Sequence, residues 1–90
     1  MKELEKNLKA LANRRRLEIL KFLKYKQNPF DASVGIIAEH IKLSFKSTSR
    51  HLAILKAQDI IEISRQENLH IFYKISANIK PEIKTFISML

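Results

Sequence analysis

The chain has 90 residues, of which 46% are hydrophobic, so it is long enough for one small domain and too apolar to be disordered. Its 17 lysines and arginines outnumber its 9 acidic residues and give a net charge of +8, which suits a polyanionic partner or serves solubility alone. It contains no cysteine, which excludes a disulfide framework, a thiolate metal site and a cysteine nucleophile.

Two helices are predicted near the start of the chain. Leucines recur at helical spacing between charged residues over residues 3–11, which indicates a short amphipathic helix. Asn13 is a good N-cap for a second helix that ends near Lys26. Residues 14–16 are all arginine, and the helix dipole disfavours cations in a first turn. We therefore expect the reason for these arginines to lie outside their own helix.

Two further helices are predicted in the middle of the chain. A proline-containing break follows the second helix, and a loop or very short strand is expected near residues 30–33. Ser33 is placed to cap a third helix that reaches His40. After a tight turn, Ser44 is placed to cap a fourth helix over residues 45–58.

The pattern then changes from helical to alternating. Residues 61–65 and 69–75 alternate between apolar and polar side chains on either side of a polar turn at 66–68, which predicts a β-hairpin. Phe72 interrupts the alternation, because it puts a large ring on the otherwise polar face. Pro81 then opens a last helix that extends to the end of the sequence.

These elements predict a mainly α-helical fold with one small β-hairpin, in the order α-α-α-α-β-β-α. No repeat and no linker is visible, so residues 1–90 are interpreted as a single domain. The order is that of a winged helix-turn-helix domain, in which the third and fourth helices bind DNA and the hairpin is the wing.

Over roughly residues 4–76 the chain resembles the ArsR family of small winged-helix repressors. Its residues 8–20, LKALANRRRLEIL, are similar to that family's opening LKALADPTRLRIL, and residues 43–55 are similar to a recognition helix ending in S-x-HL-x-x-L. The run from residue 65 to 75 resembles the wing.

The chain also departs from the family's pattern. Asp59 stands where the family usually has Gly, and Asp tolerates the left-handed backbone conformation better than most residues. Phe45 stands where a Gln often opens the recognition helix, and the wing tip lacks its usual Gly.

The fourth helix carries the side chains that we expect to contact DNA bases. Lysine and arginine can bond guanine acceptors, serine adapts to either kind of partner, and residues 42–57 include no acidic residue. The alternative is an ordinary solvated helix face. The expected contacts of the recognition helix are Phe45, Lys46, Ser47, Ser49, Arg50 and His51, with Phe45 either sealing the turn or touching a thymine methyl group. Contacts to the DNA backbone and from the wing are expected at Lys42, Lys56, Arg65, Asn68, His70, Arg14 and Arg15. The resemblance implies that Arg16 is instead a structural bridge.

A homodimer is expected because the first and last helices have apolar faces that so short a chain can hardly bury alone. The expected interface consists of Leu4, Leu8, Leu11, Ile83, Phe86, Ile87 and Leu90, and the resemblance implies the same pairing of helices. A two-fold dimer would present its recognition helices to successive major grooves about 34 Å apart, so its operator would be an inverted repeat. The alternative, open for Leu11 and Ile83, is that these side chains close the core of their own monomer.

Other classes of function lack their residues. Many members of the resembled family sense metals, but the chain has no sulfur ligand and its last helix offers only Glu82, so no metal or cofactor is expected. No Gly-rich phosphate loop or acid–base pair at a useful spacing is present, so no enzymatic activity is expected. No segment approaches the ~20 apolar residues of a membrane span and no signal peptide is recognisable, so a cytoplasmic protein without a membrane partner is expected.

The leading hypothesis is a sequence-specific repressor that binds double-stranded DNA as a homodimer and whose inducer is unidentified. The alternative is a winged-helix module for protein association, against which the basic face of residues 42–56 argues. Binding to a membrane surface through the first helices is disfavoured, because their leucines are needed for packing.

Overall fold

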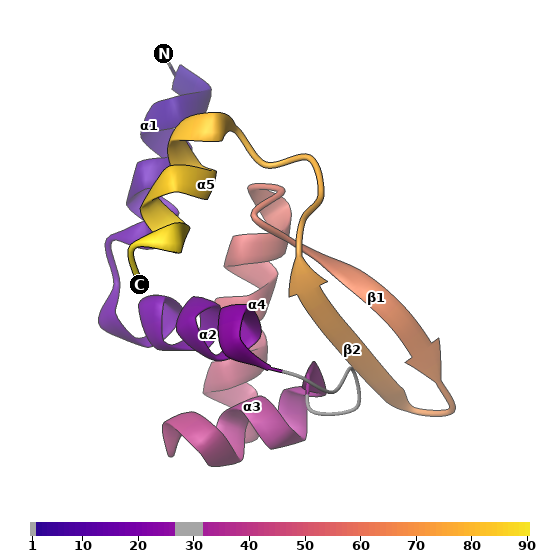
Figure 1. Ribbon diagram of the computed structural model, residues 1–90. Helices are drawn as coiled ribbons and strands as arrows, with labels where there is room; N and C mark the ends of the chain where they lie inside the picture. The colour runs from indigo at the N-terminus through magenta and orange to yellow at the C-terminus, as the bar shows by residue number, and fades with distance from the viewer. Residues whose placement is uncertain (1, 27–31) are drawn as a thin grey trace.

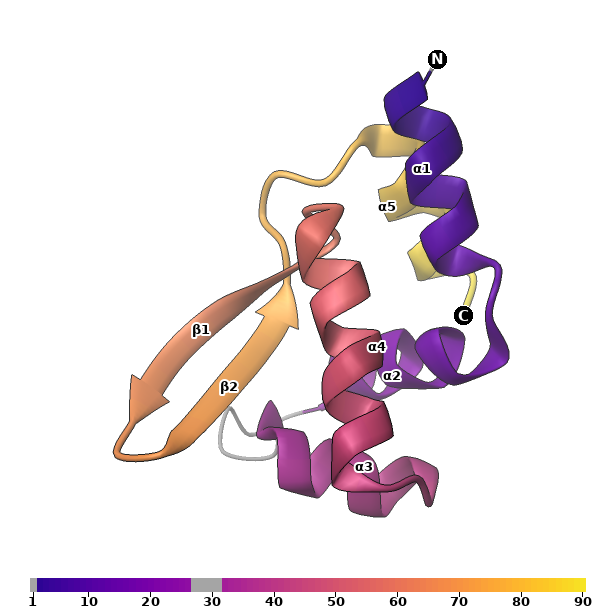
Figure 2. The same ribbon diagram turned by 180° about the vertical axis from the view of Figure 1, so that it is seen from behind.

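Five helices and two strands are formed within residues 2–26 and 32–90, which the computed structural model describes (Figure 1). In chain order they are α1 (Lys2–Leu11), α2 (Arg14–Tyr25), α3 (Val34–Ile41), α4 (Phe45–Ala57), β1 (Ile61–Glu67), β2 (His70–Ile75) and α5 (Pro81–Ser88). Their type and order confirm the predicted winged helix-turn-helix arrangement. In Figures 1 and 2, α1 and α5 lie at one end of the molecule, α3 lies at the other end, α2 and α4 lie between them, and the hairpin projects to the side.

The predicted helix caps are formed. The side-chain oxygens of Asn13, Ser33 and Ser44 each accept a hydrogen bond from the backbone N–H three residues further on, over 3.1, 3.3 and 3.1 Å. Each bond satisfies an amide that the first turn of a helix leaves without an intrahelical partner. These caps explain why α2, α3 and α4 begin where the sequence predicts.

Two helices end in a left-handed residue other than glycine. Lys42 follows α3 and Asp59 follows α4, each with a φ of 56°. In both cases the next residue donates its N–H to a carbonyl five residues back, Leu43 to Ala38 and Ile60 to Leu55, as in a Schellman motif. Asp59 therefore takes the left-handed conformation that glycine adopts most readily, which confirms the expectation from the sequence.

The hairpin differs from its prediction in two places. Its turn consists of residues 68 and 69, so the prediction of a turn at 66–68 and a strand from 69 is wrong. Asn68 has the positive φ, 53°, that a two-residue hairpin turn requires at its first position. The pairing shifts between Ile63 and Arg65, so that Ser64 is a bulge and Arg65 lies opposite Phe72.

The short extra strand is present as a single β-bridge between Ser33 and Phe72. Residues 30 and 31, which the prediction also covered, lie outside the described residues. Phe72 is 7% exposed and Tyr73 is 9% exposed, so two consecutive residues of β2 are buried. Phe72 forms the bridge to Ser33, and Tyr73 belongs to the hydrophobic core. Phe72 is therefore buried although it interrupts the alternation of apolar and polar residues.

The core lies between α2, α3, α4 and the base of the hairpin. Its fully buried large side chains include Ile19, Leu20, Ile37, Leu52, Leu55, Ile60, Ile61 and Ile83. Because the apolar stripe of α4 is inside, the opposite stripe of that helix faces outward.

Candidate nucleic-acid interface

The outer stripe of α4 brings the predicted base-contacting residues together. Lys46, Ser49 and Arg50 are exposed, and Phe45 at the start of the helix is 63% exposed. Ser47 is half-buried next to the Ser44 cap. Figure 2 shows α4 on the near side of the molecule, where no other helix or strand crosses in front of it. This stripe is the part of the helix that a DNA groove could reach.

The stripe is positively charged and uncompensated. Within the described residues, neither Lys46 nor Arg50 has an ion pair or a side-chain hydrogen bond. Lys42 and Lys56, at the two flanks of α4, are exposed as well. Four cations without an acidic neighbour on this helix are therefore available to phosphates or to guanine bases.

His51 is half-buried and is held by Arg16. Its Nδ1 lies 3.2 Å from Nη1 of Arg16, and a guanidinium can only donate, so Nδ1 accepts and Nε2 carries the proton. Burial, followed by the charges of Arg16, Arg15 and Arg50, lowers the pKa of His51 below its ordinary value. The lowered pKa favours the neutral ring, which lies at the edge of the exposed stripe.

Arg16 is a structural bridge, as the resemblance implied. Its Nε donates to the carbonyl of Ala10 and its Nη2 donates to the carbonyl of Lys9 over 3.4 Å. Together with the contact to His51, these bonds join the end of α1, the start of α2 and the middle of α4. The cation in the first turn of α2 is therefore offset by carbonyls at the C-terminal end of α1.

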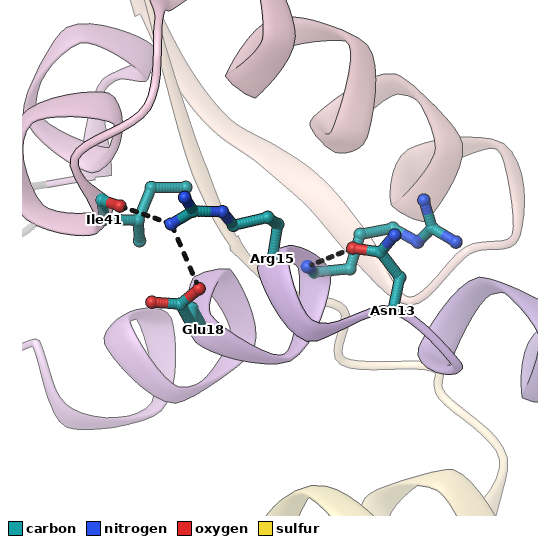
Figure 3. A network of polar contacts seen from close by, with 5 residues as sticks. Asn13, Arg15, Glu18 and Ile41 are labelled. Atoms are coloured by element: carbon teal, nitrogen blue, oxygen red, sulfur yellow. Dashed lines mark hydrogen bonds and ion pairs between the residues drawn. The ribbon is translucent and has the colours of Figure 1, made fainter.

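Arg15 and Arg14 differ in their surroundings. Nη1 of Arg15 donates to the carbonyl of Ile41 over 2.8 Å and pairs with Glu18 at 3.3 Å, so it caps the end of α3 (Figure 3). Arg14 is exposed, and its side chain has no polar partner within the described part of the chain. Of the two predicted phosphate contacts, Arg14 is the more available, and contact with DNA at either remains a prediction.

The wing presents its predicted residues unequally. Arg65 pairs with Glu67 at 2.6 Å, and its guanidinium carbon lies 4.0 Å from the centre of the Phe72 ring, so it lies on the hairpin surface. Asn68 and His70 are exposed at the tip. Leu69 lies between them and is 97% exposed, and the sequence reasoning missed it as a candidate contact. Placing Leu69 in a two-residue turn would have predicted its exposure.

Asn7 is a second residue that the sequence reasoning missed. It is 6% exposed, and its Nδ2 donates to the carbonyl of Gln58 over 3.1 Å, which ties α1 to the end of α4. A lone asparagine in a charged helix carries no pattern that reveals a partner 51 residues away.

The residues predicted for the dimer interface fall into two groups. Leu11, Ile83 and Ile87 are at most 5% exposed and belong to the core of their own chain. Leu8 is 52% exposed, and the half-buried residues of the same set are Leu4, Phe86 and Leu90. The apolar surface that remains on α1 and α5 is therefore this second group together with Met89, which is 73% exposed.

Two structural features bear on metal binding and on membrane spanning. Within the described residues, no three side chains of His, Cys, Asp or Glu come close enough together to hold a metal ion. None of the helices in residues 2–26 and 32–90 is long and apolar enough to cross a membrane.

Comparison with known proteins identifies the family. Residues 13–62 match the model for bacterial regulatory proteins of the arsR family. The whole chain is 35% identical to the transcriptional activator HlyU of Vibrio cholerae, and the alignment covers 82% of that protein. The chain belongs to the arsR family. It is thus a member of a family of transcriptional regulators, and the resemblance seen in the sequence is confirmed.

Solved structures of arsR-family proteins and their relatives share the fold. Reduced HlyU of Vibrio cholerae superimposes with a TM-score of 0.78 at 34% identity, covering 98% of this chain and 84% of that one. A homodimeric winged helix-turn-helix DNA-binding domain of Mycobacterium bovis, described as a possible ArsR-family regulator, gives a TM-score of 0.77 at 26% identity, with coverages of 98% and 74%. NolR of Sinorhizobium fredii gives 0.77 at 30% identity, with coverages of 98% and 83%.

Proposed function

We propose that this arsR-family protein is a sequence-specific DNA-binding regulator that represses transcription by occupying its operator. The observation that carries the proposal is the pair of uncompensated cations, Lys46 and Arg50, on the outward stripe of a capped α4. A helix with this arrangement suits the major groove, where long cationic side chains reach guanine O6 and N7. The Mycobacterium bovis relative is described as a DNA-binding domain, which supports the same assignment.

The operator is proposed to be an inverted repeat bound by a homodimer. The apolar surface of Leu4, Leu8, Phe86, Met89 and Leu90 lies on the two helices at one end of the molecule, whereas the hairpin projects from its side (Figure 1). A second copy packed on this surface would hide it from water and place two α4 helices about one DNA turn apart. The Mycobacterium bovis domain is homodimeric, which supports this arrangement.

A salt titration on DNA tests the proposal. Fluorescence polarisation with random duplex, and with an operator selected from a random library, is measured at several salt concentrations. Phosphate contacts predict a steep linear fall of log affinity with log salt, and selection predicts a much tighter operator. A flat salt response and no enriched sequence would refute DNA recognition and favour a protein-association module.

A matched pair of variants tests the placement of the interface. The Lys46→Ala/Arg50→Ala double variant is expected to lose operator binding while keeping its oligomeric state and helix content. Lys21→Ala removes an exposed lysine of α2 and serves as the charge control. Wild-type affinity in the double variant would show that α4 is not the reading helix.

The direction of regulation is tested in cells. A reporter gene placed behind the selected operator is expected to fall in expression when the protein is present. HlyU of Vibrio cholerae is named an activator, so a rise in expression would overturn repression while leaving DNA recognition intact.

A further inference from the structure

Among residues 2–26 and 32–90, those that line a groove between α2, α5 and the end of β2 include four lysines and no carboxylate. Its volume is about 460 Å³, within the ~300–1,000 Å³ of ordinary small-molecule sites. The cations that line it are Lys24, Lys26, Lys74 and Lys84. Its remaining lining is largely apolar and includes Leu23, Ile75, Ile79 and Ile87, which belong to the core or pack against it. The groove thus combines a cationic rim with an apolar floor.

Two of the four lysines have a partner and two do not. Nζ of Lys24 donates to the carbonyl of Ser88 over 2.6 Å, and Nζ of Lys74 lies 3.2 Å from a carboxylate oxygen of Glu62 on the neighbouring strand. Within the described residues, Lys26 and Lys84 have neither an ion pair nor a side-chain hydrogen bond. Two uncompensated ammonium groups, one following α2 and one on α5, therefore favour binding of an anion.

The position of the groove argues against both macromolecular partners of the proposed function. In Figure 1, α2 lies in front of α4, and in Figure 2 the order is reversed, so α2, which lines the groove together with α5 and the end of β2, lies on the face of the molecule opposite the reading helix. A duplex bound on α4 would not cover the groove. A second copy packed symmetrically on it would bring two sets of four lysines together, which like-charge repulsion disfavours.

We propose that this groove binds a small amphipathic anion, a carboxylate or phosphate on an apolar body, and that this ligand is an effector of the regulator. The head group pairs with Lys26 and Lys84, and the apolar body covers the floor formed by Ile75, Ile79 and Ile87. The groove joins the helix that carries Arg14 to Arg16, the wing strand β2 and the helix α5 of the proposed dimer surface. A ligand that binds one orientation of the wing relative to the dimer surface more tightly than another shifts the protein toward that orientation. The effector role rests on the proposed function, but the binding site does not.

Binding is tested on the protein without DNA. Octanoate and octyl phosphate are titrated and followed by heteronuclear NMR and calorimetry, with octylammonium as the control of opposite charge and inorganic phosphate as the control without an apolar body. One saturable site per chain is expected for the first two, with shifts centred on α5 and the end of β2, and the tighter of the two identifies the head group. Absence of saturable binding, or equal binding of octylammonium, would overturn the site.

Matched variants test the two lysines. Lys26→Gln/Lys84→Gln is expected to weaken octanoate or octyl phosphate binding at least tenfold, whereas Lys21→Gln, an exposed lysine of α2 outside this groove, leaves it unchanged. Neither altered side chain has a polar contact within the described part of the chain, so the double variant is expected to unfold at the wild-type midpoint. Wild-type binding by the folded double variant would overturn the assignment.

The effector role has a separate readout. Operator affinity of the wild type is expected to change at least fivefold with saturating ligand, and that of the double variant to stay constant. Ligand binding without any change in operator affinity would overturn the effector role and keep the site. Ligand binding by a protein that binds no DNA would refute the proposed function and likewise keep the site.

Discussion

His51 connects the exposed stripe of α4 to the interior through Arg16. Because its pKa is lowered in the folded protein, the unfolded chain binds a proton more readily than the folded chain below the ordinary pKa of 6.5. Stability is therefore unaffected by this group above that pH and is lost as the pH falls below it. Protonation would also place two like charges across the 3.2 Å contact with Arg16.

Replacing His51 by Gln is expected to remove this pH dependence. The wild type should lose more stability between pH 7.5 and 5.5 than His51→Gln, measured as the change in free energy of unfolding in urea. His70→Gln, on the exposed wing, is the control and should behave as the wild type does. Equal losses in the wild type and His51→Gln would show that another group titrates.

Arg50 is the residue on which DNA specificity is expected to depend most, because it is exposed, carries a fork of donors and has no partner in the described part of the chain. Arg50→Ala should cost about 1–3 kcal/mol of binding to the selected operator. If Arg50 reads a base, discrimination at one operator position relaxes; if it contacts a phosphate, affinity falls on all sequences and the salt slope drops by about 1. Titrations on single-base operator variants separate the two, and an unchanged affinity would contradict both.

Asn7 shows how a single hydrogen bond attaches one element to another. The amide of Asn7 holds α1 against the end of α4, in a place where only 6% of the residue reaches water. Asn7→Ala leaves the Gln58 carbonyl without this donor and should lower the free energy of unfolding by about 1–3 kcal/mol. Urea titration measures the loss, and Asn78→Ala, at an exposed asparagine of the loop before α5, should change it little.

The wing is expected to contact DNA through its tip rather than through its charges. Its cations are paired on the hairpin, Arg65 with Glu67 and Lys74 with Glu62, whereas Leu69 is 97% exposed. Apolar side chains of this kind enter minor grooves between base steps. Leu69→Ala should weaken operator binding about fivefold, equivalent to about 1 kcal/mol, without altering the salt slope, since no charge is lost. A changed slope, or no change in affinity, would contradict an apolar contact.

At the scale of elements, local chemistry made most of the fold predictable. Ser44 followed by an amphipathic run predicts α4, and Asp59 can replace glycine because a short polar side chain tolerates the left-handed turn. The hairpin turn was misplaced because a bulge at Ser64 changes the register, and alternation alone cannot reveal a bulge. Arg15 and Asn7 bond to backbone carbonyls 26 and 51 residues away, and no sequence pattern encodes such partners.

At the scale of the whole molecule, two surfaces are separated in space. The cationic stripe of α4 and the apolar surface of α1 and α5 are carried by different elements, so each can be altered without the other. Asn7, Arg16 and Gln58 connect these elements through polar contacts. The separation allows the dimer to be tested independently of DNA contact.

Leu8 gives the sharpest test of the dimer, because it is 52% exposed in the single chain and lies on the proposed interface. Leu8→Glu would bury a carboxylate without a partner in a dimer, so dimer dissociation should become easier by at least about a hundredfold, while the fold of each chain is unaffected. Sedimentation velocity measures the dissociation, and circular dichroism confirms the fold. Leu69→Glu, the same change at the exposed wing tip, should remain dimeric.

The monomeric Leu8→Glu should also bind the inverted-repeat operator more weakly, since it engages one half-site at a time. A dimer of wild-type strength in Leu8→Glu would place the two-fold contact elsewhere on the molecule.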